Sequence, residues 1–225
     1  MAREFTRNML IMLVSIMVGV VIITFFSADI IRRTQIETMQ IEHKTEISSI
    51  TSKNENFTNN FFQGITKLDS AREIREVGNY HFDFALFWYT NVRTNVSDVF
   101  VQNCINNCTD AMTSYETAYS NFNISKPFFE TAIGYTNQSK YIEVLGYYVT
   151  FAQSGKQISL LRYNASQFLK QAVENLSNGD MTNVSLLMTL FNETEALYNG
   201  AMGGYSGSQG QIDEYWFFDT IREPH

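Results

Sequence analysis

An uncharged apolar run near the amino terminus constrains this chain more than any other feature. The eighteen residues from Met9 to Phe26, MLIMLVSIMVGVVIITFF, contain no charged side chain. As a helix, such a run extends about 27 Å, which is close to the hydrocarbon thickness of a bilayer. The sequence therefore predicts a transmembrane signal-anchor helix over residues 9–27, which would contact membrane lipid.

A cleaved signal peptide is the alternative interpretation of this run. Cleavage would follow Phe26, Ser27 and Ala28, which places phenylalanine where a small residue is needed, so the sequence favours a retained anchor. Within the anchor, Ser15 and Gly19 have the small-xxx-small spacing that lets two membrane helices approach closely. This spacing is compatible with a homo-oligomer that forms through the membrane helix.

Asparagine triplets predict the side of the membrane on which the rest of the chain lies. Nine Asn-x-Ser/Thr acceptors follow the apolar run, which is more than chance would give, although an Asn-, Ser- and Thr-rich surface also produces such triplets by accident. We expect glycosylation, and therefore exposure outside the cytoplasm, at Asn56, Asn95, Asn107, Asn123, Asn137, Asn164, Asn175, Asn183 and Asn192. Residues 1–8 are then a short cytoplasmic tail of a single-pass cell-membrane protein, and the carboxy-terminal domain is extracytoplasmic. A dense set of acceptors without a cysteine framework is typical of archaeal surfaces.

Apolar residues beyond the anchor recur every three or four positions, the spacing of one face of a helix. The stripe from Ile36 to Leu68 predicts a stalk helix over residues 28–66, in which His43 and Asn54 interrupt the apolar face as polar residues do in a coiled coil. A helical ectodomain is expected over residues 67–199. Caps, glycines and a proline predict helix boundaries at Asp69–Ser70, Asn95–Asp98, Ser125–Pro127, Ser154–Gly155 and Asn178–Thr182. A kink inside one helix is expected at Gly134–Asn137.

These patterns predict an all-α fold in which the transmembrane helix continues into an extracytoplasmic antiparallel bundle of 5–6 helices. Stacked helical hairpins of the tetratricopeptide kind are the alternative, although no fixed internal period supports repeats. The glycine- and serine-rich segment 200–210 predicts a flexible linker before a carboxy-terminal aromatic helix over residues 211–225. We expect this helix to dock, on its own bundle or on another subunit, through Tyr215, Trp216, Phe217 and Phe218.

The two cysteines lie four residues apart. In a helix the α-carbons of Cys104 and Cys108 would be about 6 Å apart, which a disulfide accepts, and outside the cytoplasm they would meet an oxidising environment. The sequence favours an intrachain disulfide over a link between chains or a pair of buried free thiols.

Charge and motif content exclude several classes of function. With 16 basic and 23 acidic residues, the chain has a net charge of -7, which disfavours nucleic acid as a partner. The three histidines are far apart, and Gly204 to Ser208 lack the last glycine of a nucleophile elbow. We therefore expect no enzyme, and no catalytic, cofactor-binding or metal-binding residues.

The leading hypothesis is a membrane-anchored, N-glycosylated cell-surface interaction or scaffold protein, an accessory subunit that binds other membrane or surface proteins. An extracytoplasmic small-molecule binding or sensing subunit is the alternative, and a pocket lined by His81, Trp88 and Tyr148 would favour it. A filament subunit is the third hypothesis, because the apolar helix resembles the first helix of type IV pilins. The short basic leader that ends in glycine or alanine just before the apolar run in that family is absent here.

Overall fold

The computed structural model describes the backbone of residues 2–215, and the side chains of Met17, Thr24, Phe26, Ser27 and residues 30–215. All regular secondary structure in this range is helical, which confirms the predicted all-α class. There are four helices where five or six were expected outside the membrane: α1 Ala2–Thr94, α2 Asp98–Ile133, α3 Ser139–Ser177 and α4 Met181–Asp213. The count is lower because several predicted boundaries lie inside continuous helices.

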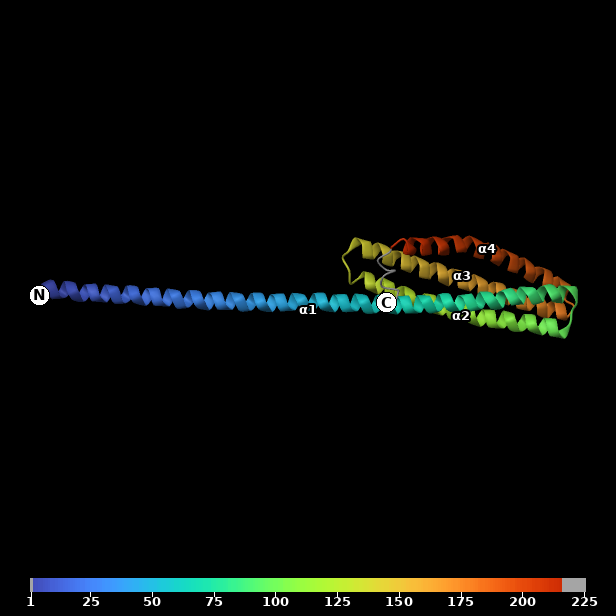
Figure 1. The fold of residues 1–225 in the computed structure, drawn as a ribbon, viewed down its shortest axis with the longest axis horizontal. Helices are drawn as coiled ribbons and strands as arrows, with labels where there is room; N and C mark the ends of the chain where they lie inside the picture. Colours follow the sequence, from blue (N-terminus) through green and yellow to red (C-terminus); the bar gives the residue numbers. More distant parts are fainter. Residues whose placement is uncertain (1, 216–225) are drawn as a thin grey trace. The chain divides into compact units, whose positions relative to one another are not determined.

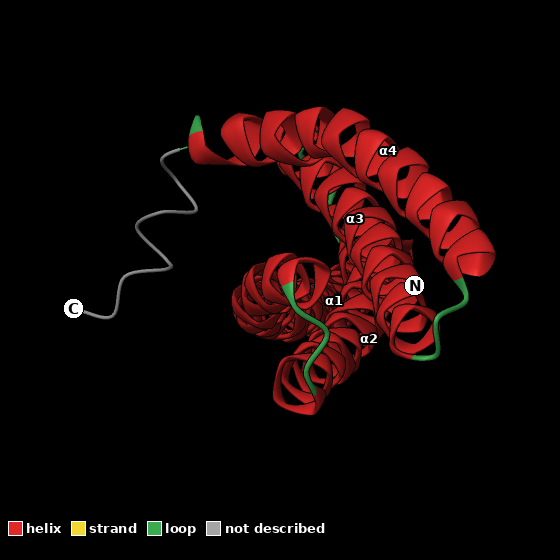
Figure 2. Ribbon diagram, turned by 90° about the vertical axis from the view of Figure 1, so that its right-hand side faces the viewer, coloured by secondary structure: helices red, strands yellow, loops and turns green. Residues whose placement is uncertain are grey.

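The chain divides into two compact units, residues 1–52 and residues 53–225. The first unit consists of the amino-terminal part of α1. In the second unit, α2, α3 and α4 run alongside the carboxy-terminal part of α1, coloured green in Figure 1. Short turns connect consecutive helices, which makes them antiparallel, and Figure 2 shows the same helices nearly end-on.

Side-chain contacts show that these helices form one bundle. Phe61 of α1 packs against Tyr148 of α3, with ring centroids 5.8 Å apart. Phe122 of α2 packs against Tyr205 of α4 at 6.3 Å, and Tyr205 also lies under Arg75 of α1 at 4.7 Å. Diagonal as well as neighbouring helices therefore share a core, as in an antiparallel bundle, whereas a stack of hairpins would keep such contacts to neighbours.

The buried positions follow a seven-residue repeat. In α1 they are Phe61, Gly64, Leu68, Ala71, Arg75, Gly78, Phe82, Ala85 and Val92, and in α2 they are Cys104, Cys108, Ala111, Tyr115, Ala118, Phe122, Ser125, Phe129 and Ala132. Steps of three and four alternate along both helices, except for one step of seven from Ala85 to Val92, where Tyr89 is half-buried. A repeat of 3.5 residues keeps one seam of each helix facing its partners and is typical of left-handed coiled-coil packing.

Two predicted sets of helix boundaries are confirmed. The Ser97 hydroxyl accepts a hydrogen bond from the Phe100 amide and caps α2, and the Asp180 carboxylate accepts one from the Asn183 amide and caps α4. Between α3 and α4, Gly179 has a φ of 76°, a left-handed conformation that glycine adopts without a steric penalty. The kink expected at Gly134–Asn137 is instead a complete turn, which ends α2 at Ile133 and separates it from α3.

Four other expectations about local structure are wrong. The predicted boundaries at Asp69–Ser70, Ser125–Pro127 and Ser154–Gly155 lie inside α1, α2 and α3, and the predicted linker 200–210 lies inside α4. At Gly155 the glycine makes room for the Phe122 ring and does not end the helix. In α4, Tyr205, Ser208 and Ile212 are buried against the bundle, and this burial outweighs the low helix propensity of the glycines.

The predicted membrane anchor lies mostly outside the described side chains. Among the residues that the structure describes in full, no helical stretch is both long and apolar enough to cross a membrane. Most of residues 9–27, including Ser15 and Gly19, fall outside that set.

Candidate functional site

A layer of charged and hydroxyl-bearing side chains lies between two apolar clusters in the bundle. The first cluster is centred on Phe61, Phe122, Phe129, Tyr148 and Phe151, and the second on Phe82, Cys104, Cys108, Leu169 and Phe191. The residues where the clusters meet, here called the polar layer, are Arg75, Tyr115, Arg162, Glu195 and Tyr198. Tyr198 itself belongs to the first cluster and Tyr115 to the second. Burying a charge destabilises the folded state unless the charge is paired. The partners of these side chains therefore decide whether they serve the packing of the bundle or could bind a ligand.

Arg162 of α3 is the most closely partnered member of the polar layer. Its Nη1 atom donates to both carboxylate oxygens of Glu195 in α4, at 2.6 Å each. Its guanidinium carbon lies 3.8 Å from the ring centroid of Tyr198 and 4.5 Å from that of Phe82. Burial has the largest single effect and lowers the pKa of this guanidinium, but Glu195, Tyr198 and Tyr115 together outweigh it. The pKa is therefore raised and Arg162 stays charged.

Arg75 of α1 is 7% exposed and lies over the ring of Tyr205, 4.7 Å from its centroid. One guanidinium nitrogen donates to Glu76, whose side chain faces solvent, and the other contacts the Met202 sulfur at 3.9 Å. The Nε atoms of Arg75 and Arg162 are buried without a hydrogen-bond partner among the described residues. Both arginines are therefore held by their terminal nitrogens and by aromatic rings.

A cleft of about 410 Å³ lies between α1 and α4 beside Arg75. It is lined by Asp69, Arg72, Glu73, Arg75, Glu76, Tyr205 and Gln209. Three carboxylates oppose two guanidinium groups, which gives the lining a net charge of only -1. Arg72 already contacts Asp69 at 3.6 Å, and Arg75 contacts Glu76, so four of the five charges are paired with one another.

Tyr115 of α2 is completely buried, and its hydroxyl donates to the Asn79 side-chain oxygen at 2.9 Å. Gly78 leaves the space that its ring occupies, since a β-carbon there would lie 2.8 Å from the ring. Burial raises the pKa of the Tyr115 hydroxyl above its ordinary value near 10, and the nearby Arg162 only partly opposes this. The folded protein therefore retains this proton at a pH where the unfolded chain loses it.

This difference predicts a loss of stability in alkali. Because the Tyr115 pKa is raised in the folded state, its contribution is fully present below about pH 10 and is lost as the pH rises further. Above that pH, the ionisation of Tyr115 is expected to make the free energy of unfolding fall by about 1.4 kcal/mol per pH unit. Tyr115→Phe should lack this part of the fall. Urea titrations between pH 8 and 11 measure it. Tyr80→Phe, at an exposed position of α1, is the control, and equal slopes in all three proteins would contradict the prediction.

The pocket expected from His81, Trp88 and Tyr148 does not form. Tyr148 stacks on Phe129 at 4.9 Å in the first cluster, whereas Trp88 packs on Phe100 at 5.8 Å beside the second. His81 lies on the bundle surface, with Nδ1 3.5 Å from the side-chain oxygen of Asn107. The three side chains belong to separate environments, which removes the specific support for a sensing site in the core.

The predicted disulfide is also wrong, since Cys104 and Cys108 are free and buried. An unbroken α-helix holds the β-carbons of residues i and i+4 about 5–6 Å apart, whereas a disulfide needs about 3.5–4.5 Å, a stricter test than the α-carbon distance. The Cys104 thiol instead donates to the Ala85 carbonyl oxygen of α1 at 3.2 Å. The two thiols act as small core residues at inward positions of α2.

The carboxy-terminal docking cluster is described only at its first member. Tyr215 is half-buried and lies 6.0 Å from the ring of Tyr147 in α3, so it packs on its own bundle. Trp216, Phe217 and Phe218 lie outside the described residues.

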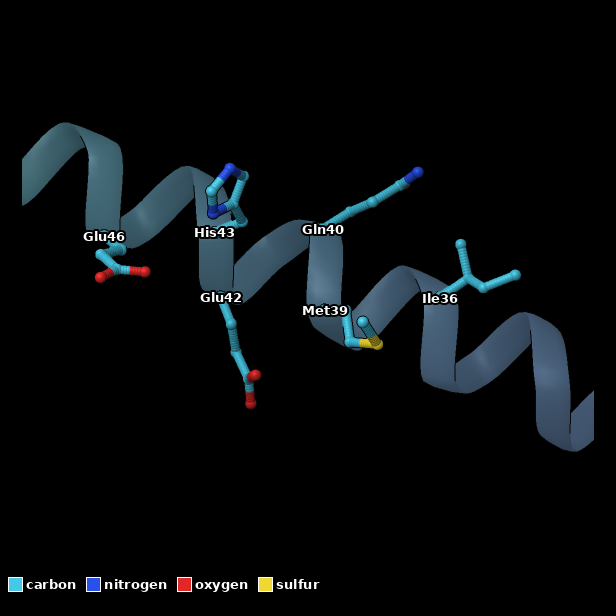
Figure 3. Close-up of a pocket in the computed structure, with 6 residues that line it drawn as sticks. All are labelled: Ile36, Met39, Gln40, Glu42, His43 and Glu46. Atoms are coloured by element: carbon cyan, nitrogen blue, oxygen red, sulfur yellow. The ribbon is translucent and has the colours of Figure 1, made fainter.

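The first unit offers no enclosed site among its described residues. Figure 3 shows Ile36, Met39, Gln40, Glu42, His43 and Glu46 around a shallow hollow, and all six side chains come from one helix and point in different directions. Among the described side chains, no group of three or more His, Cys, Asp or Glu residues lies close enough together to hold a metal ion. Neither the hollow nor the polar layer presents a nucleophile beside a general base.

Comparison of the chain with models of protein families, with proteins of described function and with solved structures gave no match in any of the three. The functional argument therefore rests on the residues and their geometry.

Proposed function

We propose that this protein is a membrane-anchored, N-glycosylated cell-surface interaction protein whose helical bundle is held outside the cell by residues 9–27. The observation that carries the proposal is the position of the nine acceptor asparagines: none is buried. Five are exposed, at Asn95, Asn123, Asn137, Asn183 and Asn192, and four are half-buried, at Asn56, Asn107, Asn164 and Asn175. A glycan needs such a position because it is bulky and hydrated.

The interior of the bundle supports an interaction role over a catalytic or sensing one. Arg162 is neutralised by Glu195, and the Tyr115 hydroxyl is satisfied by Asn79. A buried polar layer of this kind fixes which helix faces which, and this is a documented use of buried polar groups in helical bundles. The surface then remains free for other membrane or surface subunits, and the aromatic segment after Tyr215 is the part we assign to their docking.

Glycosylation is the first test. Purified from its native membranes, the full chain is expected to require detergent and to lose mass on enzymatic or chemical deglycosylation. Asn192→Gln should remove the mass of one glycan because it deletes an exposed acceptor in α4. Asn199→Gln, also exposed in α4 but outside any acceptor triplet, should leave the mass of the glycans unchanged. Intact-mass spectrometry measures both.

Two outcomes would overturn the proposal. If the chain stays in solution without detergent, the proposed membrane anchor is wrong. If its mass in the native source is that of the unmodified chain, the proposed glycosylation is wrong. Stoichiometric subunits that co-purify from the same membranes would support the accessory role.

A further inference from the structure

An apolar face of α1 in the first unit is exposed among the described residues. Every side chain from Ile30 to Glu55 is exposed, and this stretch includes Ile36, Met39, Ile47 and Ile50, each between 45% and 66% exposed. Large apolar side chains that gather along one helix in this way mark an interaction surface.

This part of α1 also lacks the composition of a helix that is stable alone. Ten of the 26 residues from 30 to 55 are Ile or Thr, and none is Ala or Leu. β-Branched side chains lose rotamer freedom in a helix, and most helical stability in proteins comes from packing of an apolar face. A helix of this composition therefore depends on a packing partner.

The seven-residue repeat of the bundle core continues through this exposed stretch. Counting back from Phe61 by alternate steps of four and three reaches Phe57, Asn54, Ile50, Ile47, His43, Gln40 and Ile36 without a break. In coiled-coil nomenclature, Gln40, Ile47 and Asn54 occupy position a, and Ile36, His43 and Ile50 occupy position d. From Phe61 onward the same register is the buried seam of the bundle. The pattern before it is that of a second coiled-coil seam.

We infer that residues 36–54 of α1 pair with the same residues of a second copy of this chain, as a parallel, in-register, two-stranded coiled coil. The seam ends before Phe57, whose ring packs on Tyr141 of its own bundle at 5.7 Å. A single Asn at position a is a known determinant of register and oligomeric state, because its amide donates to and accepts from the same amide in the partner. Asn54 stands at such a position in this seam. An identical helix supplies that match at Asn54 without any further partner.

The flanking charges agree with this arrangement. In a parallel pair, each g position faces the e position of the next heptad in the partner. Arg32 at g would face Glu37 at e, which is an attractive pair. The remaining g–e pairs up to Thr58 combine Met39 with Lys44, Glu46 with Thr51 and Lys53 with Thr58, so no like charges oppose each other.

Cross-linking of single cysteines tests the register. We would introduce Ile50→Cys at position d, and Ser52→Cys at position f on the opposite face, into the full chain in mild detergent. A short bis-maleimide is expected to join Ile50→Cys chains into covalent dimers, and to leave Ser52→Cys and the parent chain largely uncoupled, since Cys104 and Cys108 are buried. Equal coupling at both positions, or none at Ile50→Cys, would overturn the proposal.

Native mass tests whether the seam holds the two copies together. Ile50→Glu is expected to halve the mass of the protein component measured by light scattering in detergent. Ile41→Glu, equally apolar and exposed but at position b, is the matched control and should leave the dimer intact. Both side chains are exposed in the single chain, so neither change should affect thermal unfolding of the bundle. A monomeric or trimeric parent protein, or the same loss in both variants, contradicts a two-stranded seam.

Discussion

Replacing Gly155 with valine is expected to lower the free energy of unfolding by about 3 kcal/mol, the upper part of the range for overpacked cores. A β-carbon at Gly155 of α3 would lie 2.4 Å from the ring of Phe122 in α2, well inside van der Waals contact. That ring cannot move away easily, because it also packs edge-on against Phe151 and Tyr205, with centroids 6.4 and 6.3 Å away. Urea unfolding of the full chain, followed by circular dichroism, measures the change.

The same substitution on the outer face of α4 is the control. A β-carbon at Gly207 would have no neighbour within 4 Å, so Gly207→Val is expected to be neutral or slightly stabilising, because glycine is the poorer helix former. Phe122→Leu combined with Gly155→Val should cost less than the two single changes added together, because the smaller side chain leaves room. Equal losses at Gly155 and Gly207 would show that close packing of α2 on α3 does not decide the effect.

Gly155 also shows what the sequence could not reveal about the fold. A Ser-Gly pair inside a helical pattern is typical of a helix end, and the same pair is compatible with a close approach of two helices. Only the residue that contacts Gly155 distinguishes a helix end from a close approach of two helices. That residue is Phe122, which lies 33 positions earlier in the chain. At Asn178–Gly179 the stop signal was correct, because there the backbone itself adopts a positive φ and no distant contact is needed.

The polar layer was missed for a related reason. At helical spacing after Leu68, the apolar or uncharged choices for the inward face of α1 are Ile74, Val77 and His81. The buried positions are Arg75, Gly78 and Phe82, one residue further along, and Val77 is 50% exposed. A strict count of seven from Phe61 and Leu68 would have placed Arg75 in the core. Choosing hydrophobic residues for the core therefore gave the wrong face, whereas the seven-residue period gives the right one. A charged residue at an inward position of that period is a signal for a buried polar layer.

The glycines of α4 illustrate the opposite error. Local propensity predicts a linker over residues 200–210, yet Tyr205 stacks on Phe151 with centroids 4.5 Å apart and holds this part of the helix on the bundle. Packing of one large aromatic ring is worth more than the helix propensity lost at several glycines. What the sequence predicted well are the features set locally: helical class, the caps at Ser97 and Asp180, and the turn at Gly179.

Glu195→Gln is expected to lower the free energy of unfolding by about 3 kcal/mol, the lower end of the range for breaking a buried ion pair. The lower end applies because the side chains of Arg162 and Glu195 are still 17% and 22% exposed. Without Glu195, the guanidinium of Arg162 would remain charged between the rings of Tyr198 and Phe82, and its Nε atom has no hydrogen-bond partner among the described residues. The aromatic faces provide part of the compensation, since a cation over a desolvated ring gains about 2 kcal/mol.

Removing both charges distinguishes two effects on the free energy of unfolding: the penalty of leaving Arg162 charged and unpaired, and the net contribution of the ion pair itself. The double variant Arg162→Met, Glu195→Gln is expected to be more stable than Glu195→Gln alone, because methionine fills the space between the rings without a charge that must be neutralised. Glu130→Gln is the control for a surface pair: Glu130 contacts Lys126 at 3.5 Å with half its side chain exposed, so its loss should have little effect. Urea unfolding at pH 7 compares all four proteins. A double variant less stable than Glu195→Gln would mean that Arg162 stabilises the bundle mainly through its aromatic contacts, and that the polar layer is not held together by its charge pair.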